Sequence, residues 1–469
     1  MRVSRTVFRF GAAAAIAAAS ATAVLAQADD RYPRPSSQLP AVTGSVPTQP
    51  GQPQPWSGEP GSSGHPLMTP DAILAAVSDF KNCIERTWPD AARRNISRAS
   101  FDRFTRDLEP DLRIMDLMDA QPEFTKAFWD YVDTLVNDER IARGREILKQ
   151  YEPTFAAAEK QYGVDRHIIV AIWGIETKFG TVSGERPVIR STATLACVGR
   201  RQSYFRDEFL AALEILHRGD VRPELLKGSW AGAFGATQFM PTAFKRYAVD
   251  FDGDGRRDVV ESVPDIVAST ANHLVKAGWV SGSTWGYEVV VPQGFNYMLA
   301  DPARRLTLAE WERMGVRRVS GATFPRSGDR GYLWVPAGVR GPSFLMLDNF
   351  RAIMKYNPAE AYALAIGHLA DRLRGGGPIA QEWPRDERVL SRAERLELQQ
   401  RLASRGFDIG EPNGRLGAKT RAAVRDFQAK NGLVPDGFAS AGILVRLRGG
   451  CGPEAPPRRA PATLRRSSS

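Results

Sequence analysis

The chain has 469 residues, 43% of them hydrophobic, which is enough for a large apolar core and predicts about two to four domains. Its formal net charge is +10, from 63 basic and 53 acidic side chains, and seven arginines lie before residue 10 or after residue 451. The part between is therefore only mildly basic, which argues against sequence-specific nucleic-acid binding and favours attraction to an anionic matrix.

The N-terminal residues have the layout of a secretory signal peptide. Arg2 and Arg5 precede an alanine-rich apolar run at 11–26, and residues 26–28 form a small-residue cleavage pattern. We predict a signal peptide at residues 1–28 and export of the protein, with an uncleaved anchor as the alternative. No later segment has the ~18 uninterrupted apolar residues of a transmembrane helix. No cysteine lies near the cleavage pattern, so we do not expect a lipoprotein.

Composition divides the remaining chain into segments. Residues 29–66 are rich in Pro, Gly, Ser and Gln, which predicts a disordered tether. Helical patterns dominate residues 67–375, a linker follows at 376–388, and a compact unit occupies 389–448. Residues 449–469 form a basic tail that we expect to be disordered.

Helical spacing and capping signals predict the elements in chain order. Thr69, Pro70 and Asp71 predict a helix that continues to Lys81, with Thr69 as its N-cap. In the small unit, residues 391–394 form a capping box that opens a helix. The other expected elements are helices at 122–135, 140–162 with an interruption considered at Pro153, 205–218, 263–277, 359–373 and 420–430, and strands at 287–291 and 332–335.

The three cysteines fit an oxidising compartment. Because their number is odd, Cys83, Cys197 and Cys451 form at most one internal disulfide. We predict a Cys83–Cys197 bridge because both residues lie in the large domain, whereas Cys451 lies in a glycine-rich tail.

Residues 168–179 predict a buried helix that carries one carboxylate, Glu176, near its end. An acid among isoleucines and a tryptophan loses hydration, which disfavours its charged form and raises its pKa. A carboxylic acid that stays protonated near neutral pH can give a proton to the leaving oxygen of a glycosidic bond. The alternative is a core helix whose acid pairs with an arginine.

Three sets of residues in the large domain resemble one known family. Residues 173–180, Trp-Gly-Ile-Glu-Thr-Lys-Phe-Gly, resemble the catalytic motif of the membrane-bound lytic transglycosylase B family. Residues 228–242 also match this family, as do Asn349-Phe350 with 355–357 and 362–365, in the family's order. In the small unit, the segments 398–402, 420–424, 427–428 and 432–433, with Gly414, resemble the three-helix peptidoglycan-binding domain.

The resemblance implies a mainly α fold, with a lysozyme-like catalytic domain that contains small β elements and a small three-helix peptidoglycan-binding domain. It implies an exported, periplasmic and wall-associated lytic transglycosylase whose partner is the peptidoglycan glycan strand. Such enzymes cleave the β-1,4 bond between N-acetylmuramic acid and N-acetylglucosamine without water and form a 1,6-anhydro product. No organic cofactor or nucleic acid is expected, and the protein partners stay open.

The resemblance also assigns roles to single residues. Most glycosidases use two carboxylates, but Glu185, Asp207 and Glu208 have no apolar frame like that of Glu176 in the sequence. Glu176 is therefore expected to act alone, first as general acid and then as general base. Substrate-binding roles are implied for Ser229 and Gln238, which lie in a loop whose small residues let the backbone approach a sugar. They are also implied for Tyr356, Asn357 and Tyr362. His273 stands where relatives are expected to carry tyrosine.

Residues 250–261 fit the 12-residue EF-hand calcium pattern, with acids at positions 1, 3, 5, 9 and 12 and glycine at position 6. Arg257 at position 8 and the absence of a matched helix pair favour the alternative of an aspartate-rich turn without a metal. Relatives are expected to carry a similar loop, and Asp265 is the alternative to Glu261 as the closing ligand. The predicted ligands of a structural Ca²⁺ are Asp250, Asp252, Asp254, the carbonyl of Arg256, Asp258 through water, and Glu261.

Two alternatives to the transglycosylase remain at this point. One is a hydrolytic muramidase of similar fold, which would leave a reducing end. The other is a non-catalytic scaffold that only grips peptidoglycan, and the intact motif around Glu176 argues against it.

Overall fold

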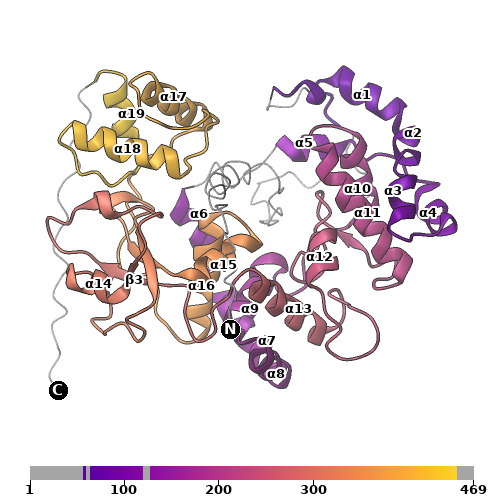
Figure 1. Cartoon of the computed structure of the whole chain (residues 1–469), viewed down its shortest axis with the longest axis horizontal. Coiled ribbons are helices and arrows are strands. Elements are labelled where there is room, and N and C mark those ends of the chain that lie inside the picture. The colour runs from indigo at the N-terminus through magenta and orange to yellow at the C-terminus, as the bar shows by residue number, and fades with distance from the viewer. Residues whose placement is uncertain (1–55, 60–63, 120–126, 451–469) are drawn as a thin grey trace, which may run out of the picture. The chain divides into compact units, whose positions relative to one another are not determined.

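The computed structural model describes residues 56–59, 64–119 and 127–450, and within them the chain is mainly helical with a small β-sheet (Figure 1). The expected mainly α fold class is confirmed. The predicted signal peptide, most of the predicted tether, Cys451 and nearly all of the predicted tail lie outside the described residues.

The first described helices form a separate apolar core with α10 (Val188–Cys197) and α11 (Gln202–Arg218). Thr69 caps α1 as predicted, because its hydroxyl accepts a hydrogen bond from the Ala72 N–H at 3.3 Å. The predicted continuation to Lys81 is wrong, since Asp79 leaves the helical dihedrals and accepts from Asn82 and Arg86 instead. These elements are η1 (Pro66–Met68), α1 (Pro70–Ser78), α2 (Phe80–Glu85), α3 (Trp88–Arg93), α4 (Arg98–Thr105) and α5 (Arg113–Asp119).

A disulfide joins this helical group to the centre of the chain. Cys83 of α2 is bonded to Cys197 at the end of α10, as predicted, with the two Cα atoms 6.0 Å apart. The bridge links residues that are 114 positions apart in sequence. It therefore fixes α2 against α10 covalently.

The largest core surrounds α9 (Arg166–Thr177), which packs against α7 and α16. The predicted helix at 140–162 is two helices that part at Tyr151, and Pro153 occupies the second position of the later one, where its missing N–H costs no hydrogen bond. The other helices of this region are α6 (Phe128–Leu135), α7 (Asp138–Gln150), α8 (Glu152–Tyr162), α10 (Val188–Cys197), α11 (Gln202–Arg218), α12 (Pro241–Tyr247), α13 (Val263–Lys276), α15 (Asp348–Tyr356) and α16 (Glu360–Leu373).

An antiparallel sheet of strand order β4-β6-β7-β3-β5 lies between α13 and α15 in the chain. The two predicted strands are β3 and β6, and β7 was not expected. All four residues of β7 are buried, so its sequence lacks the apolar–polar alternation that marks a half-exposed strand. The bounds are β3 (Gly286–Val290), η3 (Tyr297–Leu299), β4 (Leu306–Thr307), α14 (Leu308–Arg313), β5 (Arg317–Arg318), β6 (Arg330–Trp334), η4 (Gly338–Arg340) and β7 (Ser343–Met346).

The C-terminal elements have a core of their own, which includes Leu398, Val424 and Leu444. The predicted capping box is present, because Ser391 Oγ accepts from the Glu394 N–H at 3.2 Å and the Glu394 carboxylate accepts from the Ser391 N–H at 2.9 Å. This unit, the small domain, contains α17 (Arg392–Ala403), α18 (Ala418–Lys430) and α19 (Ala441–Leu447).

Candidate active site

Helix α9 delivers Glu176 from its last turn. Asp165 caps the start of the helix, and Lys178 and Phe179 end it with positive φ angles of 48° and 60°. Gly174 lets the ring of Phe179 fold back onto the helix, because a Cβ atom there would lie 2.6 Å from that ring. The residues from 168 to 177 are all buried, which confirms the predicted buried helix up to Thr177, and its predicted continuation to Phe179 is wrong.

Two hydrogen bonds fix the end of α9 in place. The Arg140 guanidinium donates from Nε to the Gly174 carbonyl at 2.9 Å, and this arginine is itself buried. The Thr177 hydroxyl donates to the Ala236 carbonyl at 2.6 Å. Sequence reasoning missed both residues, since each partner lies more than 30 positions away and leaves no local periodicity as a signal.

The Glu176 carboxyl group has one protein partner and one free oxygen. Its side chain is 3% exposed, and the Tyr362 hydroxyl donates to Oε1 at 2.6 Å. No described residue hydrogen-bonds Oε2, and no ion pair among the described residues includes Glu176. Burial raises the pKa of Glu176 to about 8, although the bond from Tyr362 acts in the opposite direction. The geometry therefore matches a protonated acid and differs from the acid–arginine pair of the alternative.

No second carboxyl group in the described residues shares these properties. Glu208 is buried, contrary to what its sequence frame suggests, and burial raises its pKa. Both of its oxygens are occupied, because the Thr242 N–H donates to one at 2.9 Å and the Thr242 hydroxyl to the other at 2.7 Å. Glu208 thus caps the start of α12. Asp207 pairs with Arg94, and Glu185 is exposed.

Ser229 and Gln238 lie in a tight loop that follows β2 (Lys227–Gly228), which pairs with β1 (Arg186–Pro187). Gly228 is required there, because a Cβ atom would lie 2.0 Å from the Ala233 carbonyl oxygen. Ser229 is fully buried, and its hydroxyl accepts from the Ala233 N–H at 3.1 Å. Neither Ser229 nor Gln238 hydrogen-bonds Glu176 in the described part of the chain.

Gln238 holds a strained position in the same loop. Its φ is +54°, a left-handed conformation that is unusual for a residue with a side chain. Its amide nitrogen donates to the carbonyls of Ser183 at 3.1 Å and Gly235 at 3.0 Å. The side chain therefore ties the loop to the segment that follows α9. Gln238 is only 4% exposed, so its side chain is an internal part of the loop.

The junction of α15 and α16 brings three predicted site residues together. The Tyr356 hydroxyl donates to the Thr237 carbonyl at 2.5 Å, and Tyr362 reaches Glu176 as described. Asn357 Oδ1 accepts from the Ala359 N–H at 3.1 Å and closes the turn between the helices. Burial, and then the nearby Glu176, raise the pKa of both tyrosines, so both hydroxyls stay protonated.

His273, which stands where a tyrosine was expected, stacks against two aromatic rings. Its ring lies 4.3 Å from that of Tyr247, with an interplanar angle of 12°, and 4.5 Å from that of Tyr356. Burial, helped by Arg246, lowers the pKa of His273 to about 3, so the imidazole is neutral. Its Nδ1 has no hydrogen-bond partner among the described residues.

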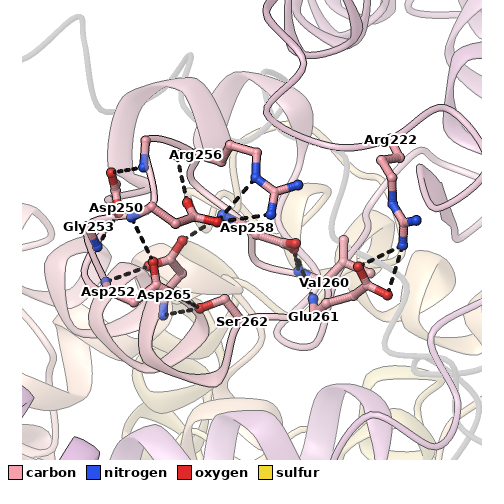
Figure 2. Close-up of polar contacts among 12 residues, drawn as sticks. Arg222, Asp250, Asp252, Gly253, Arg256, Asp258, Val260, Glu261, Ser262 and Asp265 are labelled. Atoms are coloured by element: carbon pink, nitrogen blue, oxygen red, sulfur yellow. Dashed lines mark hydrogen bonds and ion pairs between the residues drawn. The ribbon is translucent and has the colours of Figure 1, made fainter.

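The predicted metal loop gathers three aspartates and separates Glu261 from them (Figure 2). Carboxylate oxygens of Asp250, Asp252 and Asp254 all lie within 4.8 Å of one another. Glu261 instead accepts from Arg222 Nη2 at 2.9 and 3.2 Å (Figure 2). The geometry thus differs from a set closed by Glu261.

Asp265 occupies the place next to the aspartates. Its carboxylate accepts from the N–H group of Phe251 at 2.6 Å and from that of Asp258 at 2.7 Å. Figure 2 shows Asp265 beside Asp252. Asp258 is buried and accepts from the N–H groups of Val260 and Glu261, while the backbone N–H of Arg256 donates to Asp254. Clustered carboxylates around a turn of this kind fit a hard divalent cation such as Ca²⁺.

Comparisons with known proteins found two families whose models match the chain. The family model described as "Transglycosylase SLT domain" matches residues 79–371, and "Putative peptidoglycan binding domain" matches residues 391–447. The chain is 31% identical over 273 residues to membrane-bound lytic murein transglycosylase B of Escherichia coli strain K12, which covers 55% of this chain and 72% of that protein.

Solved structures of similar proteins extend the likeness to the fold. SltB3 of Pseudomonas aeruginosa, in complex with NAG-anhNAM-pentapeptide, matches with a TM-score of 0.76 and 45% identity over 79% of this chain and 99% of that one. The Escherichia coli lytic transglycosylase Slt35, in complex with calcium, matches with a TM-score of 0.54 and 26% identity over 63% of this chain and 92% of that one. The lysozyme-like fold implied by the sequence motifs is thereby confirmed.

Proposed function

The chain belongs to the lytic murein transglycosylase family and is a lytic enzyme that acts on peptidoglycan, and we propose that Glu176 is its single general acid and base. The proposal is carried by the state of the Glu176 carboxyl group. It is buried, its pKa is raised to about 8, and its Oε2 has no protein partner among the described residues. A proton held on Oε2 at neutral pH has no competing acceptor among the described residues, which is the state that transfer to a substrate requires.

In the first step Glu176 gives this proton to the glycosidic oxygen as the bond from that oxygen to the anomeric carbon of N-acetylmuramic acid breaks. The carbonyl of the substrate's own N-acetyl group stabilises the positive charge on the sugar. The Tyr362 hydroxyl remains on Oε1 and holds the carboxylate that is left behind.

In the second step the 6-hydroxyl oxygen of the same sugar bonds to the anomeric carbon, and its proton returns to Glu176. The ring closure gives a 1,6-anhydro end, and no water is added. The NAG-anhNAM-pentapeptide bound to SltB3 supports an anhydro product for this chain as well. Among the described residues, no second carboxyl group has a buried oxygen without a hydrogen-bond partner, which fits a nucleophile that the substrate supplies.

Ser229, Gln238, Tyr356, Asn357 and Tyr362 are proposed to form the substrate-binding surface around Glu176. Their support is the network that ties their loop and helices to the end of α9. Ala236 and Thr237 of the loop accept from Thr177 and Tyr356, so the loop and the acid keep one geometry. In this arrangement Ser229 and Gln238 shape the loop that the glycan meets.

The loop from Asp250 is proposed to bind Ca²⁺ as a structural ion. The proposed ligands are the side chains of Asp250, Asp252 and Asp254, the carbonyl of Arg256, and Asp258 through water, and Asp265 is favoured over Glu261 at the closing place because Glu261 pairs with Arg222. The calcium in the Slt35 structure supports this assignment. The ion would brace the start of α13, where Asp265 lies.

The domain boundaries and the location are also proposals. Residues 67–375 are assigned to catalysis and 389–448 to peptidoglycan binding, which the two family matches support. Tethering to the wall raises the local concentration of substrate. Among the described residues, no helix is long and apolar enough to cross a membrane. A wall substrate and the predicted signal peptide support a periplasmic location.

The test is mass spectrometry of sacculi digested by the enzyme. Products that carry 1,6-anhydro-muramic acid support the proposal, whereas ordinary reducing ends would establish the hydrolytic muramidase. The Glu176→Gln variant is digested beside the wild type, and near wild-type turnover in that variant would refute the assigned acid. A zymogram with purified peptidoglycan excludes the scaffold if a cleared band forms.

A further inference from the structure

The small domain is held against the catalytic domain by a bidentate ion pair. Arg421, in the first turns of α18, donates from Nη2 to Glu360 Oε1 at 2.7 Å and from Nη1 to Oε2 at 3.0 Å. Both side chains are about three-quarters buried, with relative exposures of 26% and 22%. A two-bond fork of this kind fixes orientation as well as distance.

Other contacts show that this pair belongs to an interface. Asp436 of the small domain accepts from the Val339 N–H at 3.0 Å, and the Ala441 N–H donates to Glu387 of the linker at 3.2 Å. At Gly338 a Cβ atom would lie 2.4 Å from the Asp436 carboxylate, so the two surfaces approach closely. The small domain is therefore seated on the catalytic domain and is more than a unit on a tether.

The position of Glu360 connects this interface to the acid. Glu360 is the first residue of α16, and Tyr362, which donates to Glu176 at 2.6 Å, lies two residues later in the same turn. Ala359 precedes the helix and has no side chain that can cap it. The first turn of α16 is thus anchored by Asn357, which accepts from the Ala359 N–H, and by the pair of Glu360 with Arg421.

We propose that Arg421 is a positioning residue for the reaction: by holding Glu360 it fixes the first turn of α16, and with it the Tyr362 hydroxyl against the catalytic carboxyl group. This inference rests on the proposed role of Glu176. It gives the small domain a second task beside wall binding, because its docked state completes the support of the active site. Detachment of the small domain from the catalytic domain during wall binding would therefore lower turnover.

The experiment measures kcat and KM of the full-length enzyme on soluble peptidoglycan fragments, together with binding to intact sacculi. We expect Arg421→Ala to lower kcat roughly threefold to tenfold, which is the size that one partly exposed ion pair can exert on a rate. KM and sacculus binding are expected to stay at their wild-type values. Arg421→Lys keeps the charge but not the fork and is expected to recover part of the lost kcat.

A double-mutant cycle separates coupling from general damage. Glu360→Ala is expected to lower kcat as Arg421→Ala does, and the double variant to lose no more than either single variant. Lys419→Ala is the matched control, because Lys419 lies on the same helix and pairs with Asp408 at an exposed site of the small domain. This control is expected to keep the wild-type kcat.

Three results would overturn the inference: wild-type kcat in Arg421→Ala, multiplicative losses in the double variant, or a change confined to KM. A Glu176→Gln variant that keeps near wild-type turnover would instead refute the proposed function itself. An inactive Glu176→Gln variant beside a fully active Arg421→Ala variant would remove only the positioning role. The two failures are therefore distinguishable.

Discussion

The hydroxyl of Tyr362 lies 2.6 Å from Oε1 of Glu176, although 186 positions separate the two residues in the sequence. The hydrogen bond leaves Oε2 as the only oxygen of the carboxyl group without a protein partner among the described residues. A buried acid with one oxygen anchored and one free can transfer a proton in a single defined direction. The contact between α9 and α16 therefore sets both the protonation state and the orientation of the catalytic carboxyl group.

Tyr362→Phe removes the anchor and keeps the ring. Because the bond from Tyr362 lowers the pKa of Glu176, its loss is expected to raise that pKa further above 8. We expect kcat to fall roughly tenfold and the unfolding free energy by about 1–3 kcal/mol, since a buried acceptor loses its donor. The measurements are kcat as a function of pH and urea unfolding. An unchanged pH profile would contradict the assigned hydrogen bond.

The raised pKa of Glu176 also predicts how activity depends on pH. The reaction needs the protonated acid, so kcat/KM is expected to decrease as the pH rises through about 8. Turnover of soluble fragments between roughly pH 5 and pH 10 tests this, because that range brackets the transition. A profile that decreases above an ordinary glutamate pKa, near 4.5, would show that Glu176 is not desolvated.

The same residue links pH to stability. In the unfolded chain Glu176 releases its proton near its ordinary pKa of 4.5, but the folded protein retains it up to about 8. Its contribution to stability is therefore fully present below pH 4.5 and is lost as the pH rises towards and through 8. Glu176→Gln removes this loss of stability, so the variant is expected to melt at a higher temperature than the wild type at pH 8. Because the variant lacks the acid, its activity is expected to fall by a factor on the order of 10³.

Glu185→Gln is the control for this comparison, because Glu185 is an exposed acid nine positions further along the chain. It is expected to leave both the activity and the melting temperature unchanged. Equal melting temperatures of Glu176→Gln and the wild type at every pH would contradict the raised pKa.

The sequence was sufficient to predict what depends on neighbours in the chain. The apolar residues around Glu176 indicate burial directly, and the caps at Thr69 and Ser391 are formed within three residues. The break at Asp79 was missed, because a locally helical pattern does not reveal that a carboxylate bonds two later side chains instead of continuing the helix.

Partners that are distant in the sequence could not be predicted from spacing. Tyr362 was assigned to the site by resemblance alone, and nothing in the sequence pairs its hydroxyl with Glu176. The burial of Glu208 and its bonds to Thr242 have the same cause, since α11 and α12 meet only in the fold. Likewise, the pattern of acids in the metal loop places Glu261 at position 12, but Arg222 lies 39 positions away and pairs with it.

The Cys83–Cys197 disulfide is expected to stabilise the folded protein strongly under oxidising conditions. It closes a loop of 114 residues, which in the chain-entropy account is worth about 4–5 kcal/mol. The double variant Cys83→Ser, Cys197→Ser is expected to lose unfolding free energy of that size and therefore to unfold at a lower denaturant concentration. Its unfolding is expected to be insensitive to reductant. Wild-type protein treated with reductant should approach the same midpoint. A midpoint that reductant does not change in the wild type would show that the bridge does not form.

The metal loop allows a comparison of two acids that differ in their partners. Calcium that binds only the folded state raises the unfolding free energy by about 2.7 kcal/mol at 100 times its Kd, so chelator is expected to lower the melting temperature. Asp265→Asn is expected to abolish the calcium-dependent part of the melting temperature, because the Asp265 carboxylate accepts from the loop N–H groups of Phe251 and Asp258. Glu261→Gln is expected to retain that part, because Glu261 pairs with Arg222.

The readout is the difference in melting temperature with and without calcium for each variant, which removes any loss of stability that is independent of the ion. The reverse pattern would restore Glu261 as the closing ligand, and identical melting of the wild type with and without chelator would exclude the metal site.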